Sequence, residues 1–169
     1  MLFRSFGTGI VPGTALNQLA DALRFAMSPP KVKAYQTVAQ SLPNGSLTAI
    51  TLDSTEFDTH TMWDAGLPTR VTILYPGYYF VSGGVAFVLN TSSYRYVRIA
   101  VNGTTLTDGN TAVAPVPSIS TRVPARATIT YLDIDDYVEV YGQQASGGAL
   151  NTGVAVGDAS DLVVSWIGQ

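Results

Sequence analysis

The chain has 169 residues, which suits one domain with a short appendage and is long enough to bury a core. Hydrophobic residues make up 46% and charged residues only 12%, against roughly 25% charged in an ordinary soluble domain, which indicates that other protein covers much of the surface. The net charge of −3 and the scattered basic residues argue against a nucleic-acid partner, the lack of cysteine excludes disulfides and thiolate chemistry, and no apolar run approaches the roughly 18 residues of a membrane helix.

Residues 14–27 are the one convincing helix in the sequence. Apolar residues recur there at spacings of three and four, which makes a single stripe, and Pro29-Pro30 ends the pattern. A lone amphipathic helix ahead of a β body favours an anchoring arm, residues 1–30, although packing on its own domain is the alternative. The apolar residues expected to make the arm's contacts are Phe3, Phe6, Leu16, Leu19, Leu23 and Met27.

From residue 31 to residue 169 the pattern changes to short β-rich runs separated by turns, which predicts one all-β head domain. Pro124 inside one run predicts an edge strand or a bulge there. About eight evenly spaced strands favour a jelly-roll β-sandwich. The predicted strands are 32–40, 47–52, 70–75, 77–89, 94–102, 119–131, 136–144 and 161–167.

The strand at 77–89 is unusual because it barely alternates between apolar and polar residues. A strand with one solvent-exposed face should alternate between apolar and polar residues. Either both of its faces are therefore buried within one subunit, or another copy of the chain covers one of them. The glycines of Ser82-Gly83-Gly84 predict a bulge or a close approach of a neighbouring strand.

No catalytic or metal-binding group is expected, and therefore no cofactor. His60 is the one histidine, without a nucleophile elbow or further ligands, so we expect an exposed loop with Met62 or Trp63 tucked beneath it. The carboxylates of residues 133–136 favour a solvated turn over a calcium site. Residues 94–99 predict a strand with alternating faces, whose Tyr and Arg residues indicate a subunit interface or, alternatively, a binding surface.

Three motifs resemble the globular head of the complement and tumour-necrosis-factor type. Residues 76–80 are similar to its G-x-Y-x-F strand, residues 135–140 to its GD-x-V strand with Asp135 where glycine is usual, and residues 160–168 to its closing strand. The resemblance implies a homotrimeric jelly roll in which one sheet faces the threefold axis. The residues expected at the trimer interface or in the core are Tyr78, Tyr79, Phe80, Val85, Phe87, Tyr137, Val138 and Trp166.

A second resemblance is to virion proteins of tailed bacteriophages, carried by residues 28–32, 39–45 and 57–59. It implies a non-enzymatic structural protein, a capsid decoration protein, head fibre or minor tail protein, that is assembled in the host cytoplasm and displayed on the virion surface. We expect a trimeric capsid decoration (cement) protein that docks on the major capsid protein through its arm. The alternative is a module at the tail tip or fibre, held by a tail or baseplate protein, that recognises a host glycan or protein through loops 103–118 and 145–158.

Overall fold

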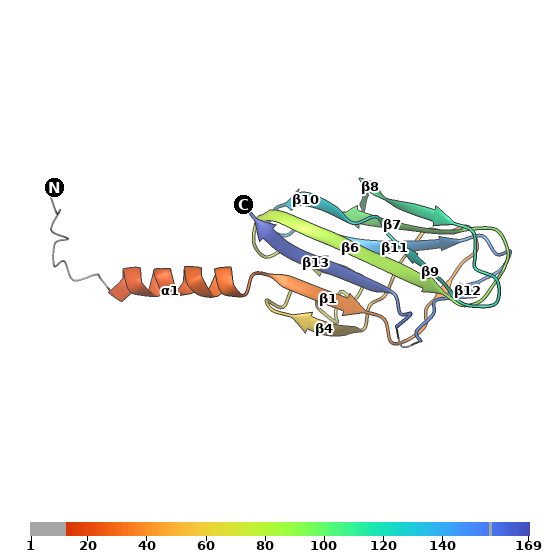
Figure 1. The fold of residues 1–169 in the computed structure, drawn as a ribbon, viewed down its shortest axis with the longest axis horizontal. Coiled ribbons are helices and arrows are strands. Elements are labelled where there is room, and N and C mark those ends of the chain that lie inside the picture. The colour runs from red at the N-terminus through yellow and green to blue at the C-terminus, as the bar shows by residue number, and fades with distance from the viewer. Residues whose placement is uncertain (1–12, 156) are drawn as a thin grey trace, which may run out of the picture.

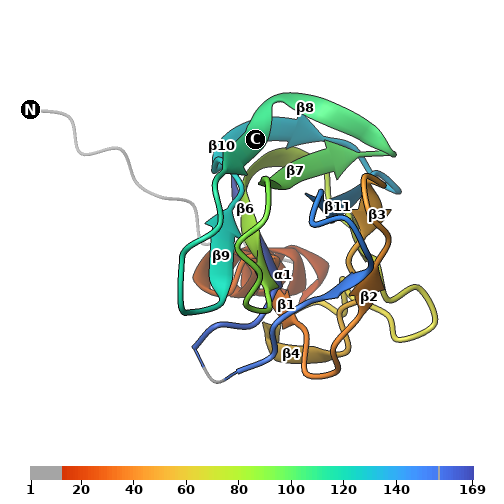
Figure 2. The same ribbon diagram turned by 90° about the vertical axis from the view of Figure 1, so that its right-hand side faces the viewer.

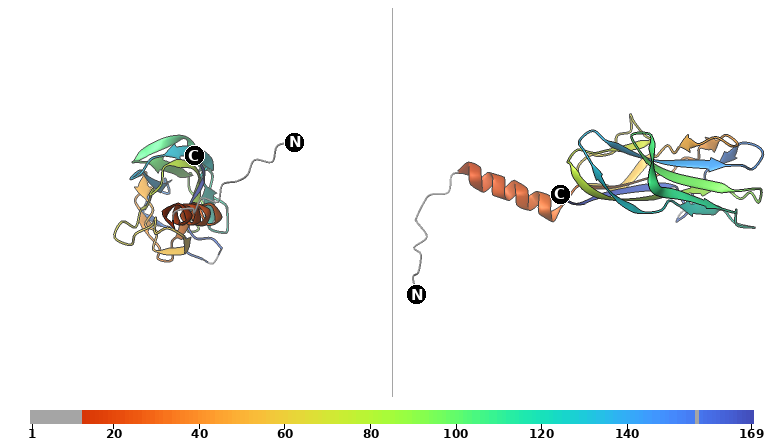
Figure 3. Two further views of the ribbon diagram at one scale, coloured as in Figure 1. Left: turned by 90° about the vertical axis from the view of Figure 1, so that its left-hand side faces the viewer. Right: turned by 90° about the horizontal axis from the view of Figure 1, so that it is seen from above.

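The computed structural model describes residues 13–155 and 157–169 (Figure 1). Helix α1 (Gly13–Met27) projects from one end of an elongated β body, and the C-terminus lies at that same end (Figures 1 and 3). Within the described ranges, no helix is long and apolar enough to span a bilayer.

One layer of the β body, called sheet 1, has the strand order β10-β6-β13-β1-β4, with β9 pairing with β6 beyond the end of β10. All of these pairs are antiparallel. The strands are β1 (Lys31–Tyr35), β4 (Ser54–Asp58), β6 (Gly77–Phe87), β9 (Thr121–Pro124), β10 (Thr128–Leu132) and β13 (Asp161–Gly168).

The second layer, sheet 2, has the order β3-β11-β7-β8, with β5 also pairing with β11, and a short β12-β2 pair lies beside the two layers. Seen along the long axis, the strands surround a common interior (Figure 2). The strands are β2 (Ser41–Leu42), β3 (Thr48–Ala49), β5 (Arg70–Thr72), β7 (Arg95–Val101), β8 (Thr104–Val113), β11 (Tyr137–Gln144) and β12 (Leu150–Asn151).

The hydrophobic core fills the space between the two sheets. Alternate residues of each strand point into it, such as Val32 and Ala34 of β1, Val97 and Ile99 of β7, and Leu162 of β13, all with no exposed surface. This alternation is what a sandwich with two solvated outer faces requires.

Strand β6 explains why residues 77–89 lack a simple alternation. Its first half alternates, because Tyr79 is buried between the sheets while Tyr78 and Phe80 are exposed on the opposite face. Its second half, residues 84–87, is buried throughout because residues 152, 153 and 160 of the same chain contact it. Gly153 N donates to Ala86 O at 2.9 Å, and Ala86 N donates to the Ser160 hydroxyl at 3.1 Å. Of the two alternatives given by the sequence, burial within one subunit therefore holds for residues 84–87.

The glycines of β6 permit a close approach of its neighbours, as the sequence predicted. A Cβ on Gly83 would lie 2.6 Å from the Asp161 carbonyl oxygen of β13. A Cβ on Gly84 would lie 3.0 Å from the Val123 carbonyl oxygen of β9. Any side chain at Gly83 would therefore push β6 and β13 apart.

The strand predicted over 32–40 ends at Tyr35, and that predicted over 47–52 is limited to Thr48–Ala49. Three further predicted segments differ from the structure. Residues 104–113, part of the predicted loop 103–118, form β8, in which Gly109 packs close to the Ile99 backbone beside a register shift. Residues 54–58 form the edge strand β4 rather than a loop. The run 119–131 is two strands, since the chain leaves the β6 ladder after Pro124. For residues 104–113, pairing with β7 overrode the local turn signal of Asp108-Gly109.

Helix α1 matches its predicted range. Asp21 and Arg24 form an exposed ion pair at 3.3 Å, and none of the helix's residues is buried. The helix is followed at once by Ser28-Pro29-Pro30 and then β1. It is therefore attached to sheet 1 by a linker of only three residues.

Candidate functional site

The outer face of sheet 1, which points away from the core, carries a continuous set of exposed apolar side chains. We call Tyr78 and Phe80 of β6 with Ile129 and Tyr131 of β10 the outer patch; their exposed fractions are 47%, 37%, 60% and 50%. Ile167 of β13, at the bulge beside Tyr78, is another 50% exposed. Apolar side chains grouped in this way mark a surface that contacts another molecule.

The strand register brings the outer patch together. Phe80 pairs directly with Ile129, and Tyr78 pairs with Tyr131 across the β6–β10 ladder. The two tyrosine rings meet edge to face, with centroids 5.4 Å apart. Such cross-strand aromatic contacts hold the side chains in one geometry, so the patch is a formed surface in the single chain.

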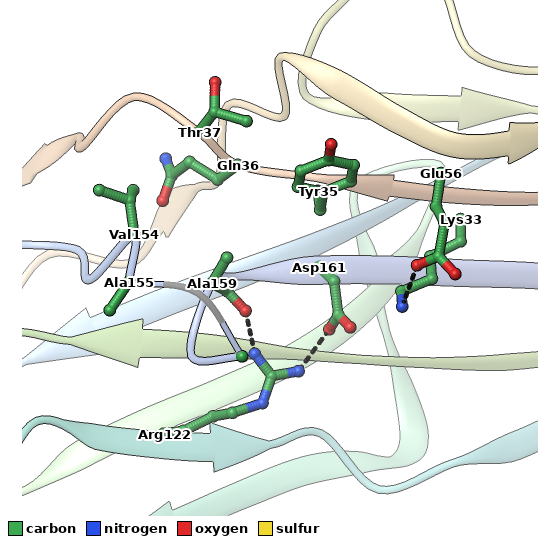
Figure 4. A pocket seen from close by; sticks show the side chains of 11 residues that line it. Lys33, Tyr35, Gln36, Thr37, Glu56, Arg122, Val154, Ala155, Ala159 and Asp161 are labelled. Atoms are coloured by element: carbon green, nitrogen blue, oxygen red, sulfur yellow. Dashed lines mark hydrogen bonds and ion pairs between the residues drawn. The ribbon is translucent and has the colours of Figure 1, made fainter.

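The other half of the same face is polar. An open cavity of about 530 Å³ lies over β1, β4, β9 and β13 (Figure 4). The residues that line it are Lys33, Tyr35, Gln36, Thr37, Glu56, Arg122, Val154, Ala155, Gly157, Ala159 and Asp161. The Arg122 guanidinium lies 2.7 Å from the Asp161 carboxylate and also donates to the Ala159 carbonyl oxygen. The Lys33 ammonium pairs with Glu56, and that hydrogen bond raises the pKa of Lys33.

These charges satisfy one another within the chain, so the cavity carries no excess charge for an ionic ligand. The outer face of sheet 1 thus has an apolar half beside a polar half. This division resembles a protein–protein interface, in which an apolar centre is bordered by polar groups.

The structure places some of the residues expected at the interface or in the core on the outer patch and others in the core. Tyr78 and Phe80 belong to the outer patch, whereas Tyr79, Val85, Phe87 and Val138 have no exposed surface and lie in the core. These four residues therefore shape the sandwich and are not available to a partner.

The remaining two predicted interface residues lie away from the outer patch. Tyr137 is on sheet 2, where the Arg70 guanidinium lies 4.8 Å from its ring centroid. Trp166 is half-buried at the end of the sandwich, where its indole nitrogen donates to Pro76 O at 3.3 Å. Neither contributes to the exposed face of sheet 1.

Ile129 and Tyr131 were missed as site residues, although they lay within a predicted strand. Their alternation with Thr128 and Thr130 places both on one face. The missing information was the pairing with β6, which aligns them with Tyr78 and Phe80.

The apolar stripe of the predicted arm is also uncovered. Leu16, Leu19, Leu23 and Met27 are 54%, 57%, 53% and 85% exposed. Phe3 and Phe6 lie outside the described residues. The helix does not pack its stripe on its own domain.

His60 belongs to an aromatic cluster at the base of the sandwich. Its ring centroid lies 5.4 Å from that of Tyr75 and 6.1 Å from that of Phe25, and its Nδ1 is 2.9 Å from the Thr59 hydroxyl oxygen. Met62 is 2% exposed, as expected for this segment. Among residues 13–155 and 157–169, no group of three or more acidic, histidine or cysteine side chains is placed to hold a metal ion.

Residues 133–136, which include three aspartates, form the turn between β10 and β11. The Asp136 carboxylate accepts from Asp133 N at 2.8 Å and from the Asn102 amide at 2.6 Å, and Asp135 has a φ of 69°. The carboxylate of Asp136 is thus used to hold this turn against the β7–β8 turn of sheet 2.

Residues 95–99 alternate as predicted, but Arg95 points inward. Its guanidinium has no exposed surface and donates to the carbonyl oxygens of Asn90, Ser92 and Tyr94 at 2.7–3.0 Å. Burial lowers the pKa of Arg95. This arginine therefore organises the loop between β6 and β7 of its own chain.

No family model and no curated protein sequence matches this chain. Solved structures with the same fold do match. The globular domain of zebrafish complement 1qA protein has a TM-score of 0.61 at 11% identity and covers 82% of this chain and 97% of its own. Murine APRIL has a TM-score of 0.60 at 14% identity, and the match covers 80% of this chain and 98% of the APRIL chain. Eiger TNF from S. frugiperda has a TM-score of 0.52 at 12% identity, and the match covers 83% of this chain and 95% of the Eiger chain.

The chain is therefore an all-β jelly-roll sandwich of the complement C1q and TNF type with one N-terminal helix, which confirms the predicted fold class. At these identities the likeness establishes the fold and leaves the function to be argued from the outer face of sheet 1.

Proposed function

We propose that the protein is a non-enzymatic homotrimer whose subunits associate through the outer face of sheet 1. The observation that carries this proposal is the outer patch, because Tyr78, Phe80, Ile129 and Tyr131 form an ordered apolar surface that residues 13–155 and 157–169 leave uncovered. The low proportion of charged residues, 12%, supports it, since a monomer would have to keep an unusually apolar surface in water.

The energy available on burial is of the same order as the cost of association. Fully burying a large apolar side chain contributes about 1.5–3 kcal/mol. Each of the four outer-patch side chains is between 37% and 60% exposed, so each still has roughly 1 kcal/mol to gain on burial. Three copies of four such residues therefore supply on the order of 10 kcal/mol, which is comparable with the cost of association.

Within this proposal the trimer is a structural virion protein of a tailed phage, most simply a capsid decoration protein held by residues 1–30. The resemblance of residues 28–32, 39–45 and 57–59 to such virion proteins supports this role. Three arms on one trimer would bind a capsid lattice together through many weak contacts. The virion surface and the major capsid protein are then its location and partner.

Sedimentation equilibrium of the purified full chain at micromolar concentration tests the trimer. We expect three times the mass of one chain, and a folded monomer would refute the proposal. Localisation of the chain on a reconstructed phage particle tests the virion role. Density on the capsid supports decoration, density at the tail tip supports the host-binding alternative, and absence from the particle refutes both.

A further inference from the structure

Helix α1 is a 15-residue helix that extends from the domain with none of its residues buried. Isolated helices of about 12–15 residues are marginally stable in water even with favourable sequences. The four large apolar residues of its stripe are all more than half exposed. The helix therefore needs a surface that covers this stripe.

The attachment of α1 to the β body sets its direction. The Phe25 ring meets Tyr75 and Trp166 edge to face, with centroid distances of 5.1 and 5.0 Å. The linker is held as well, because Trp166 N donates to Pro30 O at 2.8 Å and the Thr59 hydroxyl donates to Pro29 O at 3.1 Å. These contacts fasten the last turn of the helix beneath the sandwich.

Phe25 also shows which way the stripe faces. Its contact Trp166 pairs with Tyr79, whose side chain is buried between the sheets, so Phe25 points toward the interior of the sandwich. At 3.6 residues per turn, Leu19 and Leu23 lie about 120° and 160° around the helix from Phe25. The stripe therefore faces the same side of the molecule as the outer face of sheet 1.

We propose that the α1 helices of three subunits form a parallel three-helix bundle along the trimer axis, which rests on the homotrimer proposed above. Leu16, Leu19, Leu23 and Ala26 follow spacings of three, four and three, the a and d positions of a coiled coil. In this arrangement the helical stripe contacts the other two subunits, so the capsid contacts proposed above fall to the rest of residues 1–30, and the bundle continues the apolar surface of the outer patch beyond the heads. The heads determine the number of helices, since they bring three copies together.

The charges on α1 favour a second copy of the same helix over a charged partner. Asp21 and Arg24 are the two charged side chains of the helix, lie away from the stripe and pair with each other. Three parallel copies therefore meet without like charges in contact. A partner with a charged surface would find no complement on this aliphatic stripe.

Cysteine cross-linking of the full chain tests the bundle, because the natural sequence contains no cysteine. The test variant is Leu19→Cys, and the matched control is Gln18→Cys, one residue away and about 100° around the helix, on the side of Phe25. A disulfide requires Cβ atoms about 3.5–4.5 Å apart, which only positions facing the bundle axis reach. Mild oxidation should therefore convert two of every three Leu19→Cys chains to a covalent dimer and leave Gln18→Cys unlinked.

Sedimentation of the same samples separates this inference from the trimer proposal. Trimers in which Leu19→Cys forms no more dimer than Gln18→Cys would overturn the bundle and leave the homotrimer standing. Monomers would overturn both proposals. Trimers with selective cross-linking at Leu19→Cys support the bundle.

Discussion

Replacing Ile129 with lysine is the sharpest test of the proposed interface, because a matched control exists. Ile129 of the outer patch is 60% exposed, and Ile134 in the turn between β10 and β11 is 57% exposed. That turn is fastened to Asn102 of sheet 2, so Ile134 lies away from the outer face of sheet 1. In a single chain, Ile129→Lys and Ile134→Lys should each change the free energy of unfolding by no more than about 0.5 kcal/mol.

In a trimer the two substitutions should differ in their effect on the free energy of association. The exposed 60% of Ile129 corresponds to about 1–2 kcal/mol of burial per chain, hence about 3–6 kcal/mol per trimer. Since 1.4 kcal/mol is a factor of ten, the loss weakens trimer formation by roughly 10²- to 10⁴-fold. Burying three lysine charges adds several kcal/mol for each ion, so this range is a lower bound.

Sedimentation velocity over a dilution series measures the effect, with denaturant unfolding as the check on the folded chain. We expect Ile129→Lys to sediment as a folded monomer at concentrations where the parent and Ile134→Lys remain trimers. If all three proteins remain trimers with the same concentration dependence, the outer patch is not the interface.

Three further predictions concern the β body and the helix attachment. Gly83→Ala would place a Cβ 2.6 Å from the Asp161 carbonyl oxygen and should lower the free energy of unfolding by about 1–3 kcal/mol in denaturant melts. The control Gly148→Ala, whose Cβ would have no atom within 4 Å, should leave this free energy unchanged. Equal free energies for the two variants would contradict the close approach of β6 and β13. Burial raises the pKa of Tyr79 to about 12, so its neutral form is favoured in the fold and its stabilising contribution should decline as pH rises from about 10 toward 12; a tyrosinate absorbance titration with every tyrosine ionising near pH 10 would argue against this. Phe25→Ala should speed proteolytic cleavage within residues 13–30 while the melting of the β body changes little, and unchanged cleavage would show that the aromatic contact does not fix the helix.

Much of the fold followed from local sequence pattern. The helix and the strands over residues 70–75, 94–102, 136–144 and 161–167 were predicted because their apolar periodicity reflects burial on one face, and the strand over 77–89 because β-rich residues follow a Pro-Gly turn. Strand β8 was missed because Asp108-Gly109 resembles a turn, and only pairing with β7 makes it a strand. Strand β4 was missed because it is a short edge strand whose residues are half-buried or exposed, without an apolar alternation.

The candidate site was only half predictable. The aromatic run after Pro76-Gly77 marked β6 as unusual, but it could not show which of its residues point outward and which lie in the core. Tyr78 and Tyr79 are adjacent and of the same type, yet one is 47% exposed and the other fully buried. The pleat separates them, and the packing of sheet 2 against one face decides which is which.

The sequence by itself determined that this is a charge-poor β-sandwich with an N-terminal amphipathic helix, because composition and periodicity report the burial of each segment. Only the tertiary structure decided that Ile129 and Tyr131 join Tyr78 and Phe80 on one surface, and that the helix stripe faces the same side. Those relations depend on strand register and on the Phe25 contact between residues more than 40 positions apart in the chain, which no local pattern encodes.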